Sequence, residues 1–165
     1  MSSKLVIVSS ADKLSGTHFQ FKYNFGDNLV QGNYDSCRIK FIDMNVETNG
    51  VTAVTDGLAS MGTLFVSAQL GQDTYCNNNH AILGYTKYNL GMATGGGNFY
   101  ELKTPNPIIH NIPAIRGIVE FTILKENFAV LTGANVLSTK IIFQLEYFNK
   151  ERLSEAVGES FFSRQ

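Results

Sequence analysis

The sequence predicts an all-β domain, a sandwich or barrel of about eight short strands. Two observations support this prediction. Apolar and polar residues alternate at a period of two in several separate segments, as they do in half-buried strands. Groups of Gly, Asn, Asp and Pro separate these segments, and no helical pattern interrupts the series. A run of strands without intervening helices excludes a doubly wound parallel sheet.

Three strands are expected in the first third of the chain. Residues 4–9 form a short apolar segment, and residues 17–25 alternate aromatic with polar side chains. Residues 37–46 also alternate, but the apolar positions change phase near Phe41. Such a change of phase predicts a β-bulge or a bend at that residue.

Five further strands complete the predicted series. They are expected at residues 64–68, 81–88, 98–103, 118–124 and 139–148. Together with the first three they make eight, which we assign to one domain over residues 1–148. Residues 149–165 form a separate C-terminal tail in this interpretation.

The tail carries apolar residues at a spacing typical of a short amphipathic helix, although Gly158 weakens a helix there. Burying one Phe side chain stabilises by about 1.5 to 3 kcal/mol, so Phe161 and Phe162 are expected to dock on their own domain or on a neighbour. The tail residues assigned to an interface are Leu153, Val157, Phe161 and Phe162.

Composition limits the classes of function. Of the 165 residues, 44% are hydrophobic and 16% are charged, which excludes a disordered chain. Lys and Arg number 13 against 14 Asp and Glu, for a formal net charge of -1, so direct contact with nucleic acid is not expected. The apolar run 5–8 is too short for a signal peptide, and no segment is long enough to span a membrane. We therefore expect synthesis in a cytoplasm without secretion.

No motif in the sequence indicates catalysis. The three histidines, His18, His80 and His110, lie on separate segments without neighbouring metal ligands, and His18 is expected on a solvated face. Cys37 and Cys76 are expected to be free thiols, and Gly-x-Ser-x-Gly is absent. The expectation is a protein that is not an enzyme and has no catalytic, cofactor-binding or metal-binding residues.

Three pairs of segments carry a resemblance to a known family. Each pair combines a strand with a characteristic loop or a second strand. The pairs are 64–70 with 77–84, 106–110 with 117–124, and 131–133 with 140–147. In these segments the chain resembles the single jelly-roll capsid proteins of icosahedral double-stranded DNA viruses. It is most similar to the penton or minor capsid proteins of virophages, polinton-like viruses and their large relatives.

The resemblance implies an eight-stranded antiparallel single jelly-roll sandwich followed by a short C-terminal tail or helix. It implies a structural virion protein, located in the virion, that forms a homo-oligomer, a pentamer, and contacts other capsid proteins. Besides the tail residues above, the loops are expected to supply interface residues. These are Asn77, Asn78, Asn79, Gly96 and Asn98.

Two other classes of function stay open. One is a trimeric β-sandwich that binds a receptor or a carbohydrate, similar to tumour-necrosis-factor-like or lectin-like modules. The other is a jelly-roll enzyme, which the missing cluster of metal ligands disfavours. Oligomeric mass separates the capsid subunit from the trimeric module.

Overall fold

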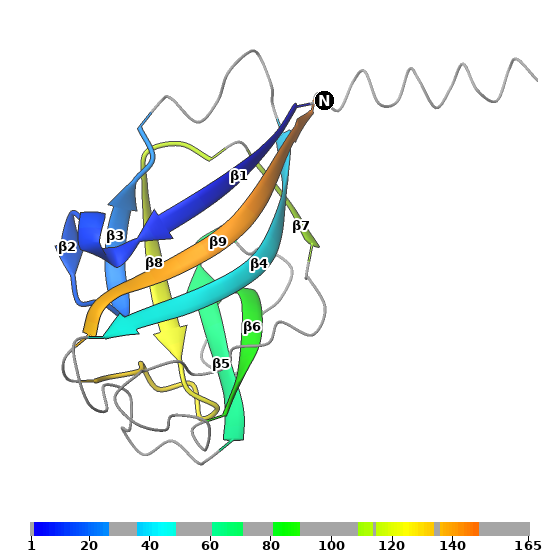
Figure 1. Ribbon diagram of the computed structural model, residues 1–165. Coiled ribbons are helices and arrows are strands. Elements are labelled where there is room, and N and C mark those ends of the chain that lie inside the picture. The colour runs from blue at the N-terminus through cyan, green and yellow to red at the C-terminus, as the bar shows by residue number, and fades with distance from the viewer. Residues whose placement is uncertain are drawn as a thin grey trace, which may run out of the picture.

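The computed structural model describes residues 2–26, 36–48, 61–70, 81–89, 109–113, 115–133 and 136–148. In these residues the chain forms nine β-strands and one 3-10 turn, η1 (Ser10–Asp12). The strands make two antiparallel sheets that face each other across one hydrophobic core (Figure 1). The prediction of an all-β sandwich-like fold is confirmed.

The four-stranded sheet has β9 and β4 at its centre. In spatial order it contains β1 (Ser2–Ser9), β9 (Val136–Phe148), β4 (Ser36–Thr48) and β7 (Ile109–Pro113). Alternate residues of β9, such as Phe143 and Leu145, are fully buried, whereas Gln144 between them reaches solvent. Ser2 pairs with Tyr147, so the start of β1 lies beside the end of β9 (Figure 1).

The five-stranded sheet is built around β8. In spatial order it contains β2 (Ser15–Gly16), β3 (Gln20–Asn24), β8 (Ile118–Leu124), β5 (Met61–Ala68) and β6 (Ile82–Asn89). Phe21 of β3 pairs with Phe121 of β8, and both side chains are buried on the inner face. In β3 burial follows the predicted period of two, whereas residues 121–124 at the end of β8 are all buried.

The strand pairs are nested along the chain. β1 pairs with β9, β3 with β8, β4 with β7, and β5 with β6. Leaving aside the two-residue β2, which pairs with β3, each strand before β6 thus pairs with one equally far from the β5–β6 pair. The chain changes sheets on the way from β1 to β2, from β3 to β4, from β4 to β5, and at each step from β6 to β9.

Aromatic rings join the two sheets at the centre of the core. The rings of Phe21 and Phe121 stack with centroids 5.7 Å apart within the five-stranded sheet. The ring of Phe121 lies 6.4 Å from that of Phe143, which belongs to the other sheet, and the ring of Phe25 lies 6.3 Å from Phe143. These distances fall in the range of favourable aromatic pairs.

The predicted irregularity in β4 is confirmed. The register of β4 against β9 shifts between Phe41 and Asp43, and the buried positions change phase from Phe41 to Met44. One extra residue in β4 gives both halves of this long strand an apolar inner face.

The set of strands differs from the predicted one. Two strands, β2 and β7, were not predicted, while the predicted strand 98–103 lies outside the described residues. β7 ends in Pro113, a residue that is typical of sheet edges, and β7 is an edge strand. The predicted tail, residues 149–165, also lies outside the described residues.

Residues 125–131 fold back over the end of β8. Phe128 adopts a positive φ of 61°, and its N–H donates to the carbonyl of Lys125 at 2.9 Å. The Phe128 ring stacks on Phe65 of β5 with centroids 5.4 Å apart. Leu124 pairs with Val130 of this segment and is fully buried.

Candidate functional site

The interface residues predicted from the sequence lie outside the described residues. They belong to two loops and to the tail: Asn77, Asn78, Asn79, Gly96, Asn98, Leu153, Val157, Phe161 and Phe162. Their role stays a prediction.

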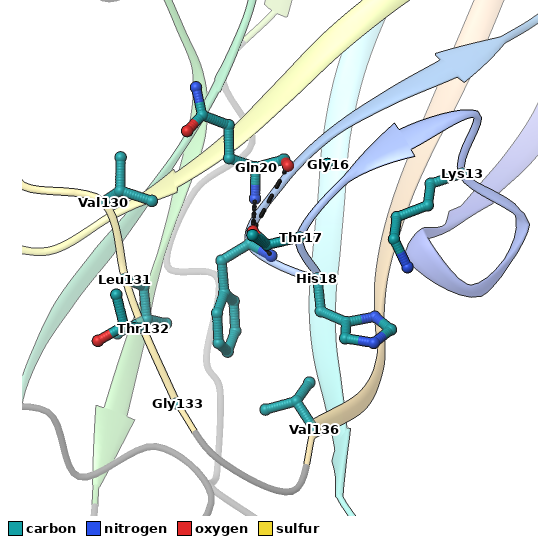
Figure 2. Close-up of a pocket in the computed structure, with 11 residues that line it drawn as sticks. Lys13, Gly16, Thr17, His18, Gln20, Val130, Leu131, Thr132, Gly133 and Val136 are labelled. Atoms are coloured by element: carbon teal, nitrogen blue, oxygen red, sulfur yellow. Dashed lines mark hydrogen bonds between the residues drawn. The ribbon is translucent and has the colours of Figure 1, made fainter.

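A pocket of about 510 Å³ lies between the turn that leads into β3 and the segment before β9. Figure 2 shows Lys13 and His18 on one side of it and Val130, Leu131 and Thr132 on the other. The sequence did not predict this pocket, because its two walls lie far apart in the chain and neither contains a recognisable motif.

Both walls of the pocket are fixed to the same residue of β8. The N–H of Ile123 donates to the carbonyl of Phe19 at 2.8 Å, and the N–H of Leu131 donates to the carbonyl of Ile123 at 2.8 Å. The side chains of Phe19 and Leu131 are only 3% and 1% exposed. The pocket is therefore a built part of the sandwich.

A tight turn forms the wall that carries His18. Gln20 and Phe19 donate their N–H groups to the Thr17 hydroxyl at 2.9 and 3.2 Å, and the Thr17 N–H donates to the Gln20 carbonyl at 2.7 Å. Gly16 precedes the turn with a φ of +102°, and a Cβ there would overlap the Gln20 carbonyl. This turn is the reason that β3 begins at Gln20 and not at the predicted residue 17.

His18 is held by a buried serine. The Ser10 hydroxyl accepts a hydrogen bond from the Thr139 N–H at 2.7 Å, and its oxygen lies 2.9 Å from His18 Nδ1. Ser10 and His18 therefore share one hydrogen bond, and the tautomer of the imidazole ring sets which of the two donates. His18 was expected on a solvated face, and the structure shows it half-buried and hydrogen-bonded.

Lys13 lies next to this histidine. Its ammonium group donates to the Ser10 carbonyl at 3.2 Å. The pKa of His18 is lowered from its ordinary value of 6.5. Burial is the larger cause, and the positive charge of Lys13 is the smaller one. At neutral pH the pocket rim therefore contains one cation, Lys13, and a neutral imidazole.

The Ser10 and His18 pair does not form a nucleophile. Ser10 is 0% exposed, so no substrate reaches its oxygen, and that oxygen already accepts the Thr139 N–H. The pair ties η1 and the turn before β3 to β9. The Ser10 and His18 contact therefore helps to hold this wall of the pocket in place.

Two other titratable groups face each other in the core. Cys37 of β4 pairs with Tyr147 of β9. Burial raises the pKa of Cys37 to about 11, against a smaller lowering by a backbone hydrogen bond with Ile115. Burial, with a contribution from Cys37, raises the pKa of Tyr147 to about 12. Both groups stay protonated at neutral pH, so Cys37 is not an activated thiolate.

Metal ligands do not gather in the described part of the chain. Within it, no three residues of the types His, Cys, Asp and Glu come close enough to hold a metal ion. Of the three histidines considered from the sequence, only the side chain of His18 is described.

The outer face of the four-stranded sheet carries an apolar strip, which we call the β1 strip and define as Leu5, Ile7 and Ile142. Leu5 and Ile7 are 63% and 55% exposed, although their neighbour Val8 is fully buried in the core. Ile7 pairs with Ile142 of β9, which continues the strip onto the next strand. The strip therefore leaves two aliphatic side chains, those of Leu5 and Ile7, largely in contact with solvent.

No helix in the described residues has the length and apolar character needed to cross a membrane. The chain matches no family model, and no match is found among curated proteins or among solved structures. Any functional conclusion therefore rests on the fold, the pocket and the surface of this chain itself.

Proposed function

We propose that this chain is a structural capsid subunit with a single jelly-roll fold. The observation that carries the proposal is the nested pairing of β1 with β9, β3 with β8, β4 with β7, and β5 with β6. A jelly roll is an eight-stranded double sheet made of two Greek keys, and it is the fold of many viral capsid proteins. Eight of the nine strands fit this order, and the two-residue β2 extends the edge beside β3.

The β1 strip supports a role that depends on contacts between subunits. Full burial of a Leu or Ile side chain stabilises by about 1.5 to 3 kcal/mol. Leu5 and Ile7 are more than half exposed in the isolated chain, so most of this stabilisation is available to an interface. Strips of this kind suit the apolar centre of a protein interface.

The mechanism that we propose is geometric. In a ring, one flank of each subunit contacts the opposite flank of the next, and the rotation between neighbours closes the assembly. A vertex subunit forms a ring of about five copies by such contacts. The loops around Asn77–Asn79 and Gly96–Asn98, and the tail from Leu153 to Phe162, are the parts of the sequence that we assign to contacts with neighbours and with other capsid proteins.

The test is the mass of the full-length protein by native mass spectrometry, with negative-stain electron microscopy of the same sample. We expect a pentamer and ring-shaped particles. A trimer would contradict the vertex role and favour the receptor- or carbohydrate-binding module. A monomer at every concentration would contradict a subunit that assembles into a ring by itself. It would leave the role of a minor shell protein whose contacts form only on the assembled particle.

A pair of matched variants tests the surface. Replacing Leu5 and Ile7 with Ser removes two exposed side chains that do not contribute to the core, so the subunit should fold and the oligomer should dissociate toward monomers. The control is Leu14→Ser, which makes the same chemical change at another exposed leucine, 57% exposed and away from β1. Equal oligomer masses for wild type and the double variant would remove the β1 strip from the interface.

A further inference from the structure

We propose that the pocket between residues 13–20 and 130–136 binds a small organic carboxylate. The carboxylate group lies at Lys13 and His18, and the apolar body lies against Phe19, Leu131 and Val136. This binding site goes beyond the proposed role in a shell and does not depend on it.

The size and the fixed walls of the pocket suit a small ligand. Its volume of about 510 Å³ lies within the range of small-molecule sites, which is about 300 to 1,000 Å³. Ile123 holds both walls through its backbone N–H and carbonyl. Since the walls are already in place, little conformational entropy is lost when a ligand binds.

The charge at the rim selects an anion. Lys13 has three N–H donors, of which one is directed at the Ser10 carbonyl at 3.2 Å, so two remain for a ligand. Within the part of the chain that the structure describes, the residues that line the pocket include no Asp and no Glu, and no ion pair joins Lys13 to a carboxylate. In the tautomer that carries the ring proton on Nε2, His18 supplies a further donor.

The number of cations favours a carboxylate over a phosphate. A phosphate carries up to two charges and is commonly held by Arg or by a group of backbone N–H donors. Among the described residues that line the pocket there is one lysine and no arginine, which matches a single negative charge. The lining also contains four apolar side chains, those of Phe19, Val130, Leu131 and Val136. A ligand with a carboxylate at one end and a hydrocarbon body therefore matches the pocket.

The first experiment compares 4-phenylbutyrate with its uncharged analogue 4-phenylbutanamide. Both are titrated into the full-length protein by isothermal titration calorimetry. We expect saturable binding of the acid and at least about fivefold weaker binding of the amide, because the amide lacks the charge-assisted hydrogen bond. Equal affinity for both compounds, or no saturation by the acid up to about 10 mM, would overturn the proposal.

Two matched variants locate the site. Lys13→Gln removes the charge and retains a hydrogen-bond donor, so it should weaken binding of 4-phenylbutyrate at least about fivefold. The control Lys22→Gln makes the same change on β3, outside the pocket, and should leave the affinity unchanged. Thermal melting of both variants checks folding. Unchanged affinity in a folded Lys13→Gln protein would also overturn the proposal.

A third arm identifies the source of the carboxylate, which is present both in free acids and in protein side chains. The probe is a peptide of residues 153–163, in which Glu159 lies near Phe161 and Phe162 in the sequence. If the peptide binds more tightly than both its E159Q form and 4-phenylbutyrate, the carboxylate in the pocket belongs to a neighbouring copy of the chain. Tighter binding of the free acid assigns it to a small molecule. Failure of 4-phenylbutyrate to bind contradicts the site, whatever the oligomeric mass and whatever the peptide does.

Discussion

The ring of Phe41, on β4, packs directly on the backbone of Gly84, on β6, across the core of the sandwich. A Cβ atom at Gly84 would overlap the ring and would lie 2.7 Å from Phe41 Cβ. Phe41 is fully buried, and Gly84 pairs with Val66 of β5 on the inner face. The two sheets therefore meet at this point with no room for a second side chain.

Gly84→Ala should destabilise the fold by about 1 to 3 kcal/mol, the usual cost of overpacking a core. The measurement is urea unfolding of wild type, the Ala variant and a double variant that also carries Phe41→Leu. Because a smaller side chain makes room for the new methyl group, the double variant should lose less stability than the two single losses added together.

The control for this experiment is Gly117→Ala. Gly117 has a φ of +68° and open space where a Cβ would lie, so its substitution strains the backbone without overpacking. Adding Phe41→Leu to Gly117→Ala should therefore recover none of the stability that Gly117→Ala loses. If the stability losses of Gly84→Ala and Phe41→Leu simply add in the double variant, Phe41 is not the residue that excludes a side chain at position 84.

The sequence predicted the strands better than their arrangement. Alternation located β8 at its observed bounds, and the change of phase near Phe41 predicted the bulge in β4, because both signals are local. Which strands pair depends on contacts between segments far apart in the chain, as in the pairing of Gln20 with Thr122. No local pattern contains this information.

The pocket was missed for the same reason. Lys13 and Thr132 come together only because Phe19 and Leu131 both bond to Ile123. β7 was missed because residues 109–113 are few and end in Pro113, a combination that is typical of a loop. Only its pairing with β4 makes it a strand.

Ser10→Ala should destabilise the protein by about 1 to 3 kcal/mol, because it leaves the buried Thr139 N–H without its acceptor. The control is Ser9→Ala, which removes an exposed hydroxyl that caps η1 through the Ala11 N–H at 3.2 Å. The loss there should stay near or below about 1 kcal/mol. Chemical denaturation measures the unfolding free energy of both variants. Equal losses of stability would contradict the importance of the buried hydrogen bond between Ser10 and Thr139.

His18 should make stability depend on pH below its unfolded pKa of 6.5. Burial and then the charge of Lys13 lower the folded pKa of His18, so the unfolded chain takes up the proton first as pH falls. The stabilising contribution is complete above pH 6.5 and is lost as pH falls from there toward the lower folded pKa.

Urea unfolding of wild type and His18→Asn between about pH 7.5 and pH 5 measures this contribution. We expect a flatter pH dependence in the variant over this window. Hydrogen bonds from Ser138 and Lys140, together with the Lys140 charge, lower the pKa of Glu47 from 4.5, so Glu47 titrates below the window. Identical pH profiles for the two proteins would contradict the role of His18.

Phe128 should respond differently to Gly and to Ala. Both substitutions remove the ring that stacks on Phe65, so both should destabilise the protein. The φ of 61° is strained for Ala and not for Gly, so Phe128→Gly should be more stable than Phe128→Ala by about 1 kcal/mol. Thermal unfolding compares them, and an Ala variant as stable as the Gly variant would contradict a strained residue at this position.

Removal of residues 150–165 should leave the sandwich folded and impair assembly. β9 ends at Phe148 and is paired along its length with β1 and β4, so the deletion removes no residue of the described sheets. Unfolding free energy should therefore change little, while the oligomer mass falls. Sedimentation velocity of the shortened chain measures the mass.

A full-length variant with Ser at Leu153, Val157, Phe161 and Phe162 separates the loss of apolar side chains from the loss of chain length, and should show the same dissociation. Retained oligomers in both proteins would place the interface elsewhere, with the β1 strip as the next surface to test.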